Sequence, residues 1–225
     1  MKLPSNAPQY QDSGLATGLD HRILYVARIS NNGAGLNGNS WVATSLPYLH
    51  YSTTTVSGMP AKVILMGAGG GQWDWVSETG YVALFGAQRR LVVDGSNLRM
   101  FNPNGSAVTF FGPSTTGALR GQQSGAVSAF GIVTTIAYDP ISLRLASETR
   151  TDPATGDQAA LVYKFESSGV HMGHILSVEK RLIRWGAVLP IHRWDYTYHS
   201  GSDSAGSLRP RKFFSVKGSD RWLGS

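Results

Sequence analysis

The sequence predicts an all-β fold, an antiparallel β-sandwich or barrel with an extended C-terminal arm, and three observations support this prediction. Glycine is abundant, with 27 among 225 residues, and only 15% of residues are charged, a composition that suits strands joined by tight turns. The longest stretch free of Gly and Pro runs only from residue 19 to residue 32, which excludes long helices. Apolar, β-branched and aromatic runs of strand length recur between the turn residues.

The expected strands are short runs, each bounded by residues typical of turns. In chain order they span residues 22–29, 41–46, 62–66, 81–85, 90–93, 107–111, 126–137, 143–149, 159–165, 192–198 and 212–216. The turns 94–97 and 102–105 contain Asp-Gly and Asn-Gly, which favour tight hairpins, so they predict a three-stranded meander. The turn 152–157 predicts a second hairpin. Regular short strands with such turns favour a sandwich or a barrel.

One segment also fits a helix. Four apolar residues between positions 175 and 185 recur at i, i+3, i+7 and i+10, the spacing of one helix face. They are Ile175, Val178, Leu182 and Trp185. The spacing predicts at most one short helix in this protein, over about residues 175–185.

The basic charge is concentrated at the end of the chain. Residues 1–179 carry 11 Lys/Arg and 11 Asp/Glu, whereas residues 180–225 carry 9 and 3, so the whole net charge of +6 belongs to the last segment. We expect one β domain over 1–199, followed over 200–225 by a Ser/Gly-rich flexible linker and a basic, aromatic arm. Large apolar side chains are costly to leave in water, so the arm should fold back or bury them on a neighbouring subunit, with its basic residues at the rim. The arm residues are Arg209, Arg211, Lys212, Phe213, Phe214, Arg221, Trp222 and Leu223.

Several classes of partner and cofactor are disfavoured. Cysteine is absent, which excludes disulfides, thiolate nucleophiles and Cys-based metal sites. Residues 1–8 carry one lysine with no apolar run behind it, so no secretory signal is expected, and no stretch approaches the roughly 18 apolar residues of a membrane span. Contact of the basic arm with nucleic acid is an alternative to a packed or solvated extension, and the second is favoured.

Five aromatic residues are candidates for contact with a ligand. Two of them alternate beside the glycine-rich segment 67–71, and three share one face of an expected strand with His192. Each set is either part of the core or a flat platform on which a sugar, a base or another protein stacks. The candidates are Trp73, Trp75, Trp194, Tyr196 and Tyr198.

The glycine-rich segment imitates a dinucleotide site without its context. An apolar run, 62–66, leads into glycines, and Asp94 ends a later run, as a ribose-binding acid would. A helix should begin at the glycines, yet the sequence after Gln72 is a poor helix former. We therefore expect a glycine loop between strands and no cofactor.

No motif marks a catalytic or metal site. The Gly-x-Ser-x-Gly elbow, the phosphate-binding loop and the His-Glu-x-x-His pattern are missing. His171 and His174 have Glu179 as their one nearby carboxylate, which makes a loop or interface pair the favoured interpretation. We expect a protein that is not an enzyme.

The cysteine-free, Gly/Ser/Thr/Asn-rich β chain, with its aromatic residues and docking arm, resembles virion structural proteins of tailed bacteriophages, such as tail, connector or capsid-decoration subunits. The resemblance concerns overall character across the chain and assigns no site residues. It implies a non-enzymatic structural subunit of a virion, assembled in the host cytoplasm as a homo-oligomer with other virion proteins. The alternatives are a carbohydrate-binding or receptor-binding module that uses the aromatic candidates, a β-rich hydrolase, and a nucleotide-binding or nucleic-acid-binding protein.

Overall fold

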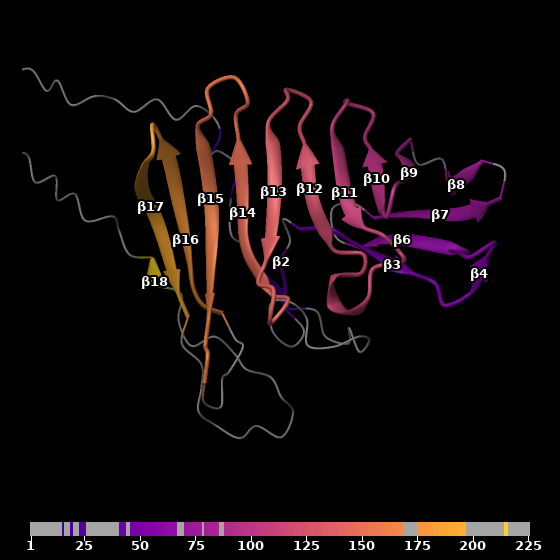
Figure 1. Cartoon of the computed structure of the whole chain (residues 1–225), viewed down its shortest axis with the longest axis horizontal. Coiled ribbons are helices and arrows are strands. Elements are labelled where there is room, and N and C mark those ends of the chain that lie inside the picture. Colours follow the sequence, from indigo (N-terminus) through magenta and orange to yellow (C-terminus); the bar gives the residue numbers. More distant parts are fainter. Residues whose placement is uncertain are drawn as a thin grey trace, which may run out of the picture.

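The computed structural model is built from antiparallel β-strands, as the sequence predicts (Figure 1). The structure describes Leu15, Leu19 and residues 23–25, 41–43, 46–66, 70–77, 79–85, 88–168, 175–196 and 214–215. Within these ranges the helical content is one short 3-10 turn, η1, Gly117–Leu119. The all-β class is therefore confirmed.

Residues 90–195, together with residues 214–215, form one ten-stranded sheet in which every strand pairs with the next one in sequence (Figure 1). The strands are β9 Arg90–Asp94, β10 Asn97–Phe101, β11 Ala107–Phe111, β12 Gln123–Val127, β13 Val133–Tyr138, β14 Leu145–Thr151, β15 Gln158–Phe165, β16 Ile175–Arg184, β17 Ala187–Asp195 and β18 Phe214–Ser215. The tight turns favour this order, because a tight turn returns the chain beside the strand that it has just left.

The turns predicted from sequence lie where they were expected. β9, β10 and β11 form the three-stranded meander, with Gly95 at φ +59° and Gly105 at φ +85°, a left-handed backbone that glycine adopts without a steric penalty. β14 and β15 form the second hairpin around residues 152–157. Both predicted hairpin units are confirmed.

A second, four-stranded sheet packs against the β9 end of the long sheet, and its strands run across those of the long sheet (Figure 1). Its strands are β3 Tyr48–Tyr51, β6 Lys62–Met66, β7 Gly71–Val76 and β8 Gly80–Ala83, and the small pairs β4 Thr55–Val56 with β5 Met59–Pro60 and β1 Ile23–Tyr25 with β2 Trp41–Ala43 complete the described strands. Side chains from both sheets interdigitate in one buried cluster, which we call the sandwich core. It consists of Leu49, Tyr51, Val63, Leu65, Trp73, Tyr81, Leu91, Leu98, Met100 and Phe110.

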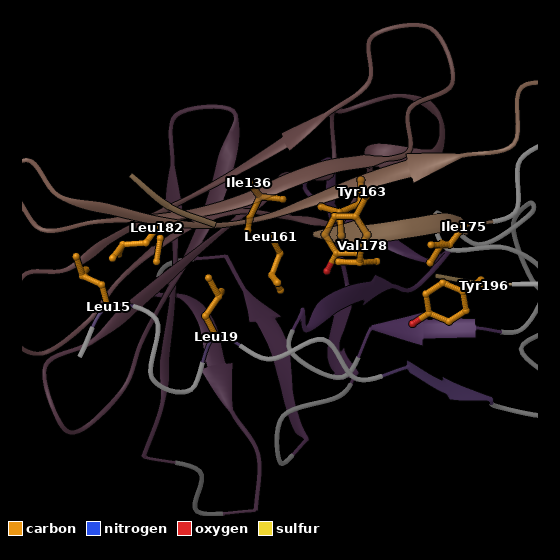
Figure 2. Close-up of a cluster of buried hydrophobic side chains, with 11 residues drawn as sticks. Leu15, Leu19, Ile136, Leu161, Tyr163, Ile175, Val178, Leu182 and Tyr196 are labelled. Atoms are coloured by element: carbon orange, nitrogen blue, oxygen red, sulfur yellow. The ribbon is translucent and has the colours of Figure 1, made fainter. Parts of the chain in front are cut away.

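A second buried cluster, the sheet core, lies beneath strands β13 to β16. Figure 2 shows Leu15 and Leu19 on one side of the sheet, below side chains of the long strands. Its members are Leu15, Leu19, Ile136, Leu145, Ala159, Leu161, Tyr163, Ile175, Val178, Leu182 and Tyr196. The register of the β11–β12 and β12–β13 pairs places Phe110 and Ile136 on the same face of the long sheet. Both cores therefore lie on that face.

The helix predicted over 175–185 is wrong, because this segment is strand β16. β16 pairs along its length with β15 on one side and β17 on the other, and these two ladders outweigh a weak helical spacing. A register shift beside Ser177 brings Ile175 onto the face of Val178 and Leu182, which reproduces the i, i+3, i+7 spacing within a strand.

The run 126–137 was predicted as one strand and is a hairpin. β12 ends at Val127 and β13 begins at Val133, with a turn between them in which Gly131 has φ +85°. The Ser128 hydroxyl oxygen accepts hydrogen bonds from the backbone N–H groups of Phe130 and Ile132 at 3.3 and 3.1 Å. The Ser128 side chain stabilises this turn, and a prediction based on the spacing of apolar residues does not detect such a contact.

Candidate interaction surfaces

The last strand of the long sheet comes from the C-terminal arm. β18 pairs antiparallel with the end of β17, Trp194 opposite Ser215 and Asp195 opposite Phe214. In the described part of the chain, no strand covers the rest of that edge, residues 187–193. Such an edge presents backbone groups that can pair with an added strand.

The arm is described only at this point. Phe214 lies in β18, and the other arm candidates lie outside the described residues. They are Arg209, Arg211, Lys212, Phe213, Arg221, Trp222 and Leu223. The docking of the arm as a whole stays a prediction.

Two ion pairs lie on the outer face beside this edge. Arg181 contacts Glu179 at 2.8 Å on β16, and Arg193 contacts Asp195 at 2.8 Å on β17. Hydrogen bonds from Arg181 hold the pKa of Glu179 below its ordinary value. Because these four charged side chains are already paired with one another, a strand from another protein would bind this edge mainly through backbone hydrogen bonds.

The first aromatic pair belongs to the sandwich core. Trp73 is fully buried, and its Nε1 donates a hydrogen bond to the carbonyl oxygen of Arg89 at 3.1 Å. Trp75 packs edge-on against Tyr81, with ring centroids 5.0 Å apart. A Cβ at Gly71 would lie 2.7 Å from Cη2 of Trp73, so the glycine makes room for the indole. Trp73 therefore offers no surface to a ligand, and the ligand-facing interpretation is wrong for this residue.

The second aromatic set lies at the margin of the sheet core. Tyr196 is buried within this core, and its backbone N–H donates to the carbonyl oxygen of Leu176 at 3.0 Å. Trp194 is half-buried against the same core and meets His192 edge-on, with ring centroids 4.4 Å apart. Tyr198 lies outside the described residues. The structure thus gives Tyr196 a packing role, and the described residues of this face form no aromatic platform.

A buried carboxyl group was missed by the sequence reasoning. Glu148 lies on β14 between Ile136 and Leu161 of the neighbouring strands and is 3% exposed. Arg150 Nη2 lies 3.5 Å from one carboxylate oxygen, and the other oxygen has no hydrogen-bond partner. Burial raises the pKa of Glu148, and Arg150 opposes this rise. The Glu-x-Arg spacing on an inward strand face was the available signal. Since apolar core residues surround Glu148, we expect this carboxyl to affect stability rather than to bind a ligand.

Two aromatic side chains stand in water at hairpin tips on the same end of the long sheet. Trp185, in the β16–β17 turn, is 95% exposed, and Phe130, in the β12–β13 turn, is 94% exposed. Trp185 has φ +49° and Gly186 has φ +79°, the two left-handed positions of a tight hairpin that usually takes Asn-Gly. The left-handed conformation costs an ordinary residue about 1–2 kcal/mol. Trp185 thus has a strained left-handed backbone conformation, and its indole is not buried in return.

A pocket of about 280 Å³ lies at the opposite end of the sheet, beside the β9–β10 turn. Its apolar wall includes Met59, Val93 and Pro113, and Arg120 lies on its polar side. Arg120 Nε donates to the carbonyl oxygen of Pro113 at 3.1 Å, and its guanidinium lies over the Tyr51 ring at 5.0 Å. These two contacts hold the Arg120 side chain in place.

The described residues contain no group of three or more His, Asp and Glu side chains placed to hold a metal ion. Within the same residues, no helix has the length and apolar character needed to cross a membrane. The described residues thus form an all-β fold in which a strand pairs with the β17 edge only at Trp194 and Asp195. A scan against models of known protein families found no match, and a search of curated proteins found none either.

Proposed function

We propose that this protein is a non-enzymatic structural subunit that assembles with copies of itself, its C-terminal arm adding a strand to the sheet edge of a neighbouring copy. The observation that carries the proposal is β18, a piece of the arm that pairs with the edge strand β17. Strand addition uses backbone hydrogen bonds, so it needs no unpaired charge at the edge.

The connection before β18 is long enough for exchange between copies. Eighteen residues separate Asp195 from Phe214. An extended chain spans at most about 3.3–3.6 Å per residue, so this connection can bridge up to roughly 60 Å. The long sheet from β9 to β17 is only about 38 Å wide, at about 4.8 Å per strand. The same strand can therefore pair with its own edge or with that of a neighbour, and exchanging an identical element between protomers costs little.

The setting that we propose is the virion of a tailed bacteriophage. Its support is the overall character of the sequence, together with an arm suited to linking repeated subunits. Carbohydrate or receptor binding through the aromatic candidates has lost support, because Trp73 and Tyr196 are core residues.

The test measures the mass of the full-length protein by light scattering after size-exclusion chromatography, over a range of concentrations. The native chain should form higher-order species. Phe214→Pro should weaken them, because proline removes the backbone N–H and disrupts strand pairing. Ser204→Pro, in the linker that precedes the arm, is the matched control and should leave the mass unchanged. A native chain that stays monomeric, or a Phe214→Pro variant that assembles like the native chain, would contradict the proposal.

A further inference from the structure

The β17 edge that no described strand covers, residues 187–193, has a backbone direction set by its hairpin. The two-residue turn 185–186 joins β16 to β17, and Arg184 pairs with Ala187 beside it. In such a hairpin the pair next to the turn exchanges both backbone hydrogen bonds, so the backbone groups of every second residue from Ala187 onward face β16. The backbone groups of Val188 and Pro190 therefore face the free edge.

A proline and a β-bulge interrupt this edge at the same place. Pro190 has no N–H, so it offers no donor to an incoming strand, and its outward position leaves the pairing of β17 with β16 intact. Ile191 has no residue opposite it in β16, because the register shifts there. Beyond the bulge, the backbone N–H of Tyr196 donates to the carbonyl oxygen of Leu176 in β16 at 3.0 Å. By the same alternation, the next outward N–H after the bulge is that of Arg193.

The resulting gap between outward donors is long. Val188 and Arg193 are five residues apart, which is roughly 16 Å at about 3.3 Å per residue. An uninterrupted strand presents an outward N–H at every second residue. β18 pairs on the far side of this gap, at Trp194 and Asp195. A short strand therefore fits the end of the edge, whereas a strand laid along the whole edge meets the gap.

The side chains of the interrupted part favour self-association. Residues 187–191 read Ala-Val-Leu-Pro-Ile, an apolar run without charge. Val188 is 52% exposed and Ile191 is 42% exposed. An exposed edge strand with β-branched side chains and no charge is a template for pairing with another copy, and proline is one of the residues with which natural proteins block such edges.

Pro190 lies at the middle of the uncovered edge 187–193. Two copies that paired these edges antiparallel would be related by a twofold axis. Pairing along the whole edge would place Pro190 opposite Pro190 of the second copy, and neither residue could donate a backbone hydrogen bond. One proline in each chain thus removes the central hydrogen bonds of the symmetric contact.

We infer that Pro190 determines the specificity of the β17 edge: it excludes the β17 edge of a second copy and confines strand addition to residues 193–195, where the occupant is β18 of the arm. The inference goes beyond the proposed function, because it holds whether β18 comes from the same chain or from a neighbouring copy. It allows an arm to link copies while their sheets stay separate along this edge.

The test replaces Pro190 by threonine in the full-length chain and measures self-association by sedimentation velocity over a range of concentrations. Pro190→Thr restores the outward N–H and supplies a β-branched residue, and it leaves the bonds to β16 unchanged. We expect about tenfold stronger self-association than in the native chain, the effect of one or two added backbone hydrogen bonds. Pro153→Thr makes the same change in the exposed β14–β15 turn, so this matched control should associate like the native chain.

Val188→Pro provides a second variant, because it removes another outward donor from the same edge. Combined with Pro190→Thr, it should return self-association to the native level. Alone, it should leave self-association unchanged, since the inference assigns no strand addition to that part of the edge. The inference is overturned if Pro190→Thr associates like the native chain, if Val188→Pro does not cancel the gain, or if Val188→Pro alone weakens association.

The proposed function fails independently of this inference. If the arm proposal alone fails, Phe214→Pro leaves the mass of the protein unchanged, while Pro190→Thr still associates more strongly than the native chain. If the inference alone fails, Phe214→Pro weakens assembly, while Pro190→Thr has no effect.

Discussion

Replacing Trp185 by asparagine should stabilise the isolated chain, although it removes a large apolar side chain. The indole is 95% exposed, so the substitution gives up only about 10 Å² of the 150–250 Å² that a buried aromatic covers, or about 0.3 kcal/mol at 25 cal/mol per Å². In return it relieves the left-handed strain at φ +49°, about 1–2 kcal/mol for an ordinary residue and less for asparagine. We expect a net gain of about 1 kcal/mol in the free energy of unfolding, which raises Tm by roughly 2–4 °C.

Urea denaturation of dilute, monomeric protein, followed by circular dichroism, measures this change. Trp185→Ala is the control, because alanine keeps a Cβ in the left-handed conformation and loses the same small burial. It should leave the free energy of unfolding within about 0.5 kcal/mol of the native value. A loss of more than about 1 kcal/mol in Trp185→Asn would refute the reasoning, since it would mean that the indole makes stabilising contacts within its own chain.

Three further predictions concern the interior of the fold. Gly121 has φ +80°, and a Cβ there would lie 2.0 Å from the carbonyl oxygen of Leu49, so Gly121→Ala should lower the free energy of unfolding by at least about 2–3 kcal/mol in urea denaturation. Gly156 has φ +74° with open space around it, so Gly156→Ala should cost about 1–2 kcal/mol in the same measurement. Trp73→Ala should cost about 3–5 kcal/mol in urea denaturation, whereas a surface residue would cost almost nothing. The pKa of Glu148 in the folded state lies above its ordinary 4.5, so the folded state binds this proton more tightly than the unfolded state does. The resulting stability is present below pH 4.5 and is lost as the pH rises through the raised pKa. Glu148→Gln should remove this loss in urea titrations over a pH series, and equal dependence of stability on pH in the two proteins would contradict the prediction.

The strands and turns of the long sheet were largely predictable because their signals are local. The turns 94–97, 102–105 and 152–157 each contain a glycine at the left-handed position that the turn needs. Apolar and polar residues alternate in the strands between these turns, so neighbouring strands can pair without information from distant residues. The 175–185 segment shows the limit of this reasoning, since one irregular step in a strand imitated the spacing of a helix.

The candidate surfaces were less predictable, because exposure depends on what packs above a residue. Trp73 and Trp185 are the same residue type, yet one is fully buried and the other is 95% exposed. Trp73 and Trp75 were candidates for a platform because they alternate beside a glycine-rich segment. The space beside Gly71 is filled by the indole of Trp73.

The sequence by itself determined the all-β class, the β9–β11 and β14–β15 hairpins of the long sheet and the separation of a basic arm from a neutral body, because composition, alternation and turn residues act between near neighbours. Only the tertiary structure decided that the four-stranded sheet covers β9 to β11, that both cores share one face, and that Trp185 stands in water opposite a pocket at the far end. These features depend on how distant segments pack against one another, and burial of that kind has no local pattern in the chain.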